Sequence, residues 1–315
     1  MKTISNYILF LLFVFPLATI AQESVENLVN VEQENEKTTA TFKSGKLINI
    51  QTIETIHRKE LDFRVDHRFG DIAGKAGGGS QFFGLDHSTD IRIGFDYGIL
   101  DNLNIGIARA KGANELTQLY ETNLKYKFLN QTTDDKIPVS IALFTSATTS
   151  AMQKSADPTS ASSFSTFGNR VAYVTQLIIA RKFSSAFSVV AIPTYVHQNY
   201  TVHGDQNSTF AIAAGGRLKF TKRMAIVADY VIPFRHKEKK EYIENISGNK
   251  FYNALGIGLE METGGHVFHL NFTNATALQE SQYITETVST WTKGQFRWGF
   301  SIARRFSFGK NNDNN

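Results

Sequence analysis

The chain has 315 residues, of which 42% are hydrophobic and 20% are charged, and it contains no cysteine. This composition excludes a disordered chain and a helical membrane protein, and the lack of cysteine excludes disulfide frameworks, thiolate metal sites and a lipidated cysteine. The net charge of +4 is spread along the chain without a dense Lys/Arg stripe, so no nucleic-acid partner is expected.

The first segment has the organisation of a secretory signal peptide. Lys2 precedes an apolar run from Tyr7 to Leu17, and Thr19 and Ala21 supply the small side chains that a cleavage site needs. The apolar run is shorter than the roughly 20 residues of a membrane-spanning helix. We therefore predict a signal peptide over residues 1–21.

Residues 22–58 are predicted to form a periplasmic N-terminal lead. The first part, residues 22–40, is acidic, rich in Asn and Gln, and free of Gly and Pro, which suits either a short helix or an irregular segment. From residue 59 the pattern of the sequence changes, so we place the domain boundary there.

From residue 59 onward, apolar and polar residues alternate. In residues 60–69 one parity is apolar or aromatic and the other is wholly charged. Because successive side chains of a strand point to opposite faces, this segment is predicted as a strand with one apolar and one ionic face. The pattern recurs at 91–99, 103–108, 120–128, 139–143, 170–182, 210–220, 224–232, 255–261 and 296–308, and more weakly at 186–199 and 266–273.

About twelve strands are predicted, and the connections between them alternate in length. Short connections fall at 101–102, 130–136, 184–185, 221–222 and 263–264, and longer ones at 70–87, 148–168, 200–207, 233–249 and 274–293, with 111–115 as a short exception. An even number of strands with short turns at one end is typical of an outer-membrane barrel. An even count also places both ends of the barrel on the periplasmic side.

A soluble β-sandwich is the alternative, because its strands alternate as well but turn the apolar face inward. Strands of ~10–14 residues exceed the usual 5–6 of soluble sheets and suit tilted membrane strands. The polar parity also mixes charged residues with many Gly and Ala, as a curved lumen would. The sequence therefore predicts an all-β fold, a transmembrane antiparallel up-and-down β-barrel over residues 59–308, followed by a polar tail at 309–315.

Six stretches of this region are distinctive: FRVDHRFGDI, GFDYGILDNLNIGIAR, PTYVHQNY, GGRLKFTKR, METGGHVFHLNFTN and FRWGFSIARRF. Together they resemble an uncharacterised family of bacterial outer-membrane β-barrel proteins, a domain of unknown function, over residues 42–308. The resemblance implies a barrel in the outer membrane of a Gram-negative bacterium, surrounded by outer-membrane lipid. It implies no activity and transfers no functional residue.

The last strand ends in GFSIARRFSF, with an aromatic residue at position 308. Outer-membrane proteins often end in such a strand, which the outer-membrane insertion machinery reads. We therefore expect that machinery as a partner during biogenesis, although the GKNNDNN tail separates Phe308 from the end of the chain.

The glycine-rich stretch GDIAGKAGGGS at 70–80 does not have the spacing of a phosphate-binding loop. Three residues separate Gly70 from Gly74, and Ala76 follows Lys75 where such a loop has Ser or Thr. A flexible surface loop explains this stretch better.

No arrangement typical of a metal site or a hydrolase is found among the histidines. His197 and His203, with Asp205, lie in or beside a loop, where sparse histidines are usually solvated. A lipid hydrolase needs a base within reach of its serine, whereas the adjacent His87 and Ser88 point apart in a strand. We predict no enzyme activity, no cofactor and no metal.

The remaining candidate site is the ionic face of the strands, which a membrane barrel turns inward. Small residues are frequent on that face, and a barrel of twelve strands lies between filled eight-stranded and open sixteen-stranded barrels. The predicted lumen-lining residues are Arg64, Arg68, Arg92, Asp96, Lys125, Arg170, Arg217, Asp229, Glu260 and Arg297.

We predict a narrow, porin-like channel for the passive passage of small polar solutes. Basic residues outnumber acidic ones on the ionic face, which favours anionic solutes. The alternative is a structural or surface-binding barrel in which opposite charges pair and close the lumen. A lipid hydrolase is a weaker third hypothesis.

Overall fold

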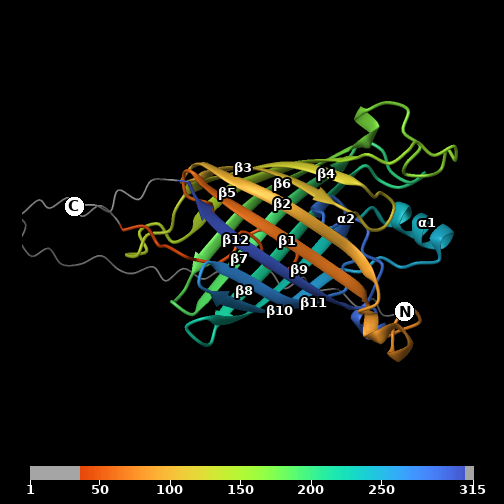
Figure 1. Cartoon of the computed structure of the whole chain (residues 1–315). Coiled ribbons are helices and arrows are strands. Elements are labelled where there is room, and N and C mark those ends of the chain that lie inside the picture. Colours follow the sequence, from red (N-terminus) through yellow and green to blue (C-terminus); the bar gives the residue numbers. More distant parts are fainter. Residues whose placement is uncertain (1–35, 309–315) are drawn as a thin grey trace, which may run out of the picture. The chain divides into compact units, whose positions relative to one another are not determined.

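The computed structural model describes residues 36–308, which form a closed β-barrel of twelve strands (Figure 1). The predicted signal peptide, the first part of the lead and the C-terminal tail lie outside these residues. The strands are β1 Glu60–Asp71, β2 Ser88–Leu100, β3 Leu103–Ala110, β4 Leu119–Leu129, β5 Ser140–Ser150, β6 Val171–Lys182, β7 Phe187–Gln198, β8 Ser208–Lys219, β9 Met224–Phe234, β10 Ala254–Thr263, β11 His266–Thr273 and β12 Arg297–Ser307.

Every strand pairs antiparallel with its neighbours in the sequence, and β1 pairs with β12 to close the barrel. In that closing pair Glu60 lies opposite Ser307 and Arg68 lies opposite Gly299. Closure leaves no sheet edge with unpaired N–H and C=O groups, which is what a sheet in lipid requires. The predicted fold, a closed antiparallel barrel of twelve strands, is confirmed.

The strands turn their two parities to opposite sides, as the alternation predicts. The strand β2, which pairs with β1 and β3, is an example. Its residues Ile93 and Phe95 are 40% and 41% exposed on the outer surface, whereas its residue Arg92 is buried inside the barrel. A continuous outer surface of exposed aliphatic and aromatic side chains is typical of a barrel that faces lipid.

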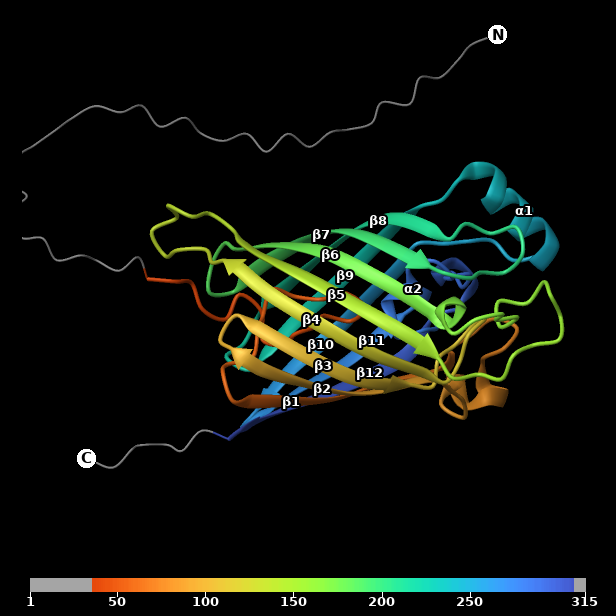
Figure 2. The same ribbon diagram turned by 90° about the horizontal axis from the view of Figure 1, so that it is seen from above.

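The connections sort into two ends of the barrel. Short turns at 101–102, 130–139, 183–186, 220–223 and 264–265 form what we call the short-turn end, and longer connections form the long-loop end (Figure 2). The long connections carry the short helices η1 Gly79–Gly84, η2 Gly168–Arg170, α1 Lys237–Ser247, α2 Glu280–Tyr283 and η3 Trp291–Lys293. Among the described residues, no helix is long and apolar enough to cross a membrane.

Two segments fill the interior of the barrel. Residues 41–56, which we call the plug, enter from the short-turn end, turn back between Lys46 and Gln51, and leave at the same end to begin β1. Residues 274–290, which we call the inner loop, fold inward from the long-loop end and carry α2. The interior is therefore built from chain segments as well as from strand side chains.

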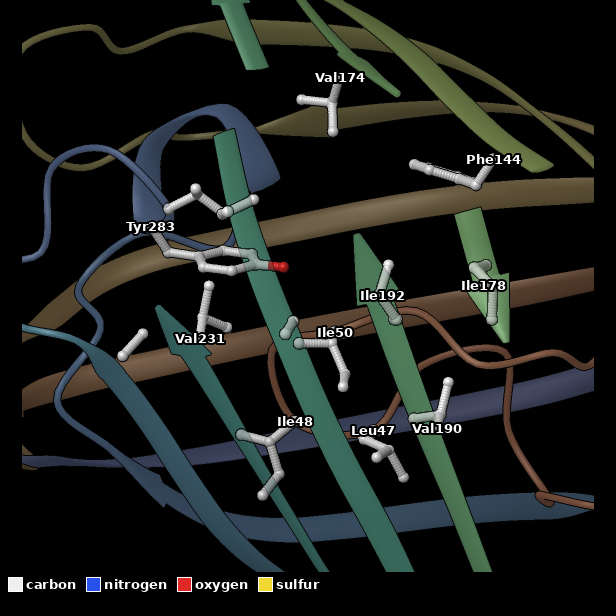
Figure 3. Packing of buried hydrophobic residues seen from close by; sticks show 14 of the residues in the cluster. Leu47, Ile48, Ile50, Phe144, Val174, Ile178, Val190, Ile192, Val231 and Tyr283 are labelled. Atoms are coloured by element: carbon white, nitrogen blue, oxygen red, sulfur yellow. The ribbon is translucent and has the colours of Figure 1, made fainter. Parts of the chain in front are cut away.

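The apolar side of the plug packs against the inner face of the barrel. Leu47, Ile48 and Ile50 are at most 5% exposed and lie beside Val190, Ile192 and Val231 of the wall, while Tyr283 of the inner loop approaches from the other end (Figure 3). We call the wall formed by β5 to β9 the aliphatic arc. Its inward aliphatic and aromatic residues include Phe144, Val174, Ile178, Val190, Ile192, Val196, Val227 and Val231.

The position of the plug differs from the predicted periplasmic lead. The aliphatic side chains of residues 47–53 explain the difference, because burying each one against the aliphatic arc is favourable by about 1.5–3 kcal/mol. The periplasmic lead stays a prediction for residues 22–35, which lie outside the described residues. The aliphatic arc also explains the weak alternation of residues 186–199, since β7 meets apolar surroundings on both faces.

Candidate functional site: a lumen closed by two segments

The tip of the plug is bound by one carboxylate of the wall. Asp229 of β9 accepts hydrogen bonds at Oδ2 from the backbone N–H groups of Ile48 and Asn49, at 2.9 and 2.7 Å, and more weakly from Ile50 at 3.4 Å. Its Oδ1 accepts a hydrogen bond of 2.5 Å from the Asn49 side chain. Three backbone donors converge on one charge because the tight turn, closed by Leu47 N–H to the Ile50 carbonyl, points them the same way.

The limbs of the plug are bound by cations on the opposite wall. Lys125 Nζ of β4 donates to the carbonyl oxygens of Gly45 and Thr52, at 3.2 and 3.1 Å, so it bridges the entering and leaving limbs. Arg64 Nη1 of β1 donates to Ser44 Oγ at 2.6 Å. These contacts satisfy buried charges with dipoles of the plug, which makes the plug part of the polar interior.

The inner loop is bound through its backbone. Arg68 Nη1 of β1 donates to the carbonyl oxygens of Ala275, at 3.2 Å, and Ala277. Asp90 Oδ2 of β2 accepts a hydrogen bond of 2.8 Å from the Leu278 N–H group. Arg68 also donates to Asn49 Oδ1 at 2.6 Å, so the same guanidinium touches both closing segments.

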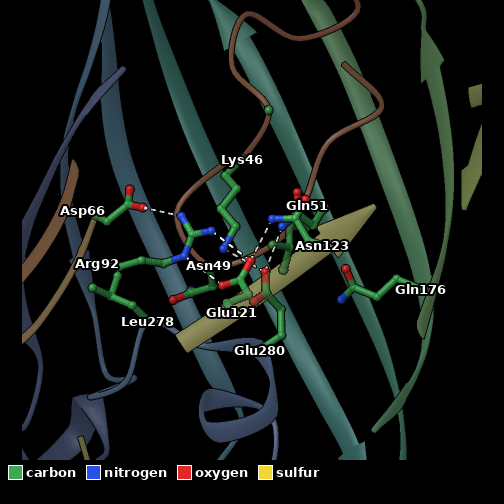
Figure 4. A network of polar contacts seen from close by, with 12 residues as sticks. Lys46, Asn49, Gln51, Asp66, Arg92, Glu121, Asn123, Gln176, Leu278 and Glu280 are labelled. Carbon is green, nitrogen blue, oxygen red and sulfur yellow. Dashed lines mark hydrogen bonds and ion pairs between the residues drawn. The ribbon is translucent and has the colours of Figure 1, made fainter. Parts of the chain in front are cut away.

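The plug and the inner loop meet at a buried carboxylate. Glu280 of α2 is 1% exposed, and its Oε1 lies 2.8 Å from Lys46 Nζ and 2.9 Å from Gln51 Nε2 (Figure 4). Lys46 and Gln51 form the isolated bridge at the base of the plug turn. The second carboxylate oxygen, Oε2, is buried without a hydrogen-bond partner.

Ion pairs within the wall neutralise most other charges. Arg92 binds both carboxylate oxygens of Glu121, at 3.0 and 2.9 Å, and lies 3.7 Å from Asp66 (Figure 4). Arg217 lies 2.7 Å from Glu260 and 3.0 Å from Glu262. Because these pairs are formed between wall strands, they do not depend on the plug.

Nine of the ten predicted lumen residues lie on the inner face of strands: Arg64, Arg68, Arg92, Asp96, Lys125, Arg217, Asp229, Glu260 and Arg297. Arg297 pairs with Asp71 at 2.5 Å. Their role in transport stays a prediction.

Arg170 is the exception among these ten residues. It lies in η2, one residue before β6 begins, at the long-loop end. There it donates to the carbonyl oxygens of Ser150 and Met152, at 3.2 and 2.5 Å, and its guanidinium stacks 4.4 Å from the Phe164 ring. Arg170 therefore lies at the long-loop rim and not on the inner face of a strand, because the chain enters the sheet only at Val171.

The space left in the barrel is unequally distributed. A cavity of about 800 Å³ opens at the short-turn end, lined by residues such as Lys43, Lys127, Arg223 and Glu262. At mid-depth, the pocket between the plug and the wall beside Lys46 has a volume of about 40 Å³. This volume holds roughly one to three water molecules, so the lumen is closed at that depth.

Within residues 36–308, no group of three or more His, Asp or Glu side chains is arranged to hold a metal ion. Of the loop cluster considered from the sequence, His197 Nδ1 contacts Ser208 Oγ at 2.9 Å. Asp205 pairs with Arg235 at 2.8 Å, so neither side chain is directed at a shared site.

Ser88 has a histidine neighbour that the sequence did not indicate. Its Oγ lies 3.1 Å from His67 Nε2, because the β1–β2 register places Phe69 opposite Ser88. His67 stacks on Phe300, but its Nδ1 has no hydrogen-bond partner in the described part of the chain. The pair therefore lacks the third group that orients the base of a hydrolase.

Comparison with solved structures finds outer-membrane barrels of low sequence identity. The KdgM porin is 9% identical, with a TM-score of 0.44 over 79% of this chain and 99% of that chain. The NanC porin is 9% identical, with a TM-score of 0.46 over 79% and 100%. The COG4313 outer membrane channel from Pseudomonas putida F1 is 10% identical, with a TM-score of 0.48 over 81% and 98%.

A family model matches residues 42–306, which include all but the first residue of the plug and all but the last residue of the strands. No curated protein matches the chain. The matched family is described as a membrane bound beta barrel domain, in agreement with the closed barrel and its apolar outer surface. The chain thus belongs to the DUF5777 family of membrane-bound β-barrel domains.

Proposed function

We propose that this protein is a porin-like barrel of the outer membrane that passes small polar solutes only when the plug has moved from the lumen. The observation that carries this proposal is the plug itself, which closes the barrel at mid-depth and is bound by polar contacts as well as by its aliphatic side chains. A solute of low polarity would find few partners among the charges that line the rest of the wall.

The outer-membrane location and the orientation rest on the two unlike ends of the barrel. Short turns at one end and long loops at the other are typical of barrels whose short turns face the periplasm. Under this orientation both ends of the barrel chain, at β1 and β12, lie on the periplasmic side. The predicted signal peptide at residues 1–21 would bring the chain to that compartment.

The path of the plug supports its release as a unit. It enters beside the bridge between Lys37 and Thr132 and leaves beside Gly98, whose carbonyl accepts a hydrogen bond from Lys59 N–H. Both points lie at the short-turn end, so the plug can withdraw into the large cavity and the periplasm without threading through the barrel. The aliphatic contacts oppose withdrawal, so the closed state is expected to dominate.

The excess of basic residues on the ionic face favoured anionic solutes, but the ion pairs of the wall do not support such a selectivity. Arg92 and Arg217 are paired with Glu121 and Glu260 inside the wall. These pairs remain when the plug leaves, and a paired guanidinium adds little net charge to the lumen. We therefore propose small polar solutes as the class, without a preferred sign.

A second function, a permanently closed barrel that binds ligands through its loops, is favoured by the aliphatic arc. Buried aliphatic side chains usually belong to a permanent hydrophobic core, and those of the aliphatic arc stabilise the plug strongly in its closed position. This reading makes the plug structural and assigns the activity to the long-loop end.

Conductance across planar lipid bilayers separates the two functions. We expect the full mature chain to be mostly silent and a variant without residues 41–56 to give discrete conductance steps. A variant without α1, which lies outside the lumen, is the matched control and should remain silent. If the plug-deleted barrel inserts and migrates as a folded barrel before heating but gives no steps, the permanently closed barrel is correct.

A further inference from the structure

The plug and the inner loop reach the centre of the barrel from opposite ends. Residues 36–40, which lead into the plug, are mostly exposed, whereas the plug itself is buried at Lys46. The inner loop is buried at Glu280 and leads to η3, where Thr292 and Lys293 are exposed at the long-loop end. The two segments together form a continuous chain of contacts from one end of the barrel to the other.

The contact between them is an ion pair that neither segment can lose without cost. Lys46 and Glu280 are 7% and 1% exposed, and their charged atoms lie 2.8 Å apart. Removing one partner of such a pair leaves a buried charge without compensation, which is strongly destabilising. The unpartnered Oε2 atom means that Glu280 depends on its Oε1 contacts with Lys46 and Gln51 for compensation.

We propose that the Lys46–Glu280 ion pair is a latch through which the inner loop controls the plug. Displacement of the loop at the extracellular end removes Glu280, leaves Lys46 without this partner, and weakens the binding of the plug. Because coupling between two sites is reciprocal, release of the plug weakens the inner loop to the same extent. The latch rests on the proposed function, since it describes how that passage is regulated.

Lys46 also faces carboxylates of the wall, and these determine which substitution tests the latch best. Glu121 and Asp66 interact electrostatically with Lys46, although Arg92 already pairs with both of them. A change at Lys46 alone therefore disturbs the wall as well as the latch. Glu280→Gln is the cleaner change, because it keeps the shape of the side chain and leaves the wall pairs intact.

The test uses single cysteines, which the chain otherwise lacks. Leu47→Cys reports on the plug, since Leu47 is 1% exposed in the closed state, and Ser281→Cys reports on the inner loop, since Ser281 is 3% exposed. Each is combined with Glu280→Gln or Lys46→Gln in barrels reconstituted in phospholipid vesicles, and the rate of modification by a charged maleimide is measured. Glu241→Gln, in the exposed Lys237–Glu241 pair of α1, is the matched control.

We expect Glu280→Gln to raise the labelling rate of Leu47→Cys by about tenfold or more, and Lys46→Gln to raise that of Ser281→Cys. The double change should add little to either single change, and the exchange Lys46→Glu with Glu280→Lys should restore part of the protection. The latch is refuted if Glu280→Gln labels no faster than Glu241→Gln, or if the effects of the two single changes simply add.

Labelling and conductance distinguish the latch from the proposed passage. Coupled labelling without conductance in the plug-deleted barrel retains the latch and overturns the passage. Conductance in the plug-deleted barrel with labelling unaffected by Glu280→Gln retains the passage and overturns the latch.

Discussion

Asp229 determines how firmly the tip of the plug is bound, because its carboxylate accepts several backbone hydrogen bonds at once. Asp229→Ala leaves the N–H groups of Ile48 and Asn49 buried without an acceptor, at a cost of about 1–3 kcal/mol for each group. We expect faster hydrogen exchange of the amides in residues 46–51, measured by mass spectrometry.

Asp157→Ala, in an exposed loop, is the control and should leave that exchange unchanged. Unchanged protection of residues 46–51 in Asp229→Ala would show that the aliphatic contacts alone hold the plug.

Glu286 makes closure of the inner loop dependent on pH. Burial, together with the nearby Glu115, raises the pKa of Glu286 from its ordinary value of 4.5 to about 8. The closed loop therefore holds a proton that an open loop releases. The stabilisation is full below about pH 4.5 and is lost as the pH rises through about 8.

We expect the inner loop to become more susceptible to proteolysis between pH 5 and pH 8.5. Glu286→Gln mimics the protonated side chain, so the rate of cleavage in this variant corrects for the pH dependence of the protease itself. A constant ratio of cleavage rates between the native chain and Glu286→Gln across this range would contradict the prediction.

At the scale of elements, the strands could be predicted from the sequence and the plug could not. Arg64, for example, lies between two outward-facing residues, so the two-residue period of a strand predicts that its side chain points into the lumen. The plug turn at Lys46–Gln51 has no such period, and the run Leu47, Ile48 and Ile50 is too short to indicate where it is buried.

Two signals pointed toward the plug. Aliphatic residues on the lumen parity, such as Val190 and Ile192, are unsuited to a water-filled lumen and require an apolar partner. The other signal is the short aliphatic run at residues 47–53, whose side chains would be unfavourably exposed if the segment lay in water. Contacts such as Lys46–Glu280 join residues far apart in the sequence, and no local pattern specifies them.

The aliphatic face of the plug yields a prediction at this scale. Ile50 is fully buried, so Ile50→Ala removes packed side-chain volume and should weaken binding of the plug by about 2–5 kcal/mol. We expect faster cleavage of the plug by a lysine-specific protease added at the short-turn end. Ile93→Ala on the outer surface is the control, and equal cleavage rates for both variants would contradict the prediction.

At the scale of the whole molecule, a position in the membrane restricts which side chains the outer surface of the barrel can carry. Ile107 is 62% exposed midway along β3, so Ile107→Arg places a charge in the lipid interior and should cost about 2–4 kcal/mol. Arg304 lies on the same surface near the short-turn end, where Arg is tolerated at about 0–1 kcal/mol.

Unfolding by guanidinium chloride in lipid vesicles measures this difference. Arg304→Ala should change the free energy of unfolding by less than about 1 kcal/mol. If Ile107→Arg is as stable as the native chain, the outer surface of β3 does not face acyl chains.

The aliphatic arc has a consequence for the emptied barrel. Once the plug withdraws, Ile192 and Val227 face the vacated space, and water recedes from such a surface. The remaining water then lies along the charged strands from β10 through β1 to β4. The cross-section of this water column is a crescent and not a full disc. Ionic current through this crescent would fall well below what the diameter of a twelve-stranded cylinder allows, and wetting, more than width, would set its size.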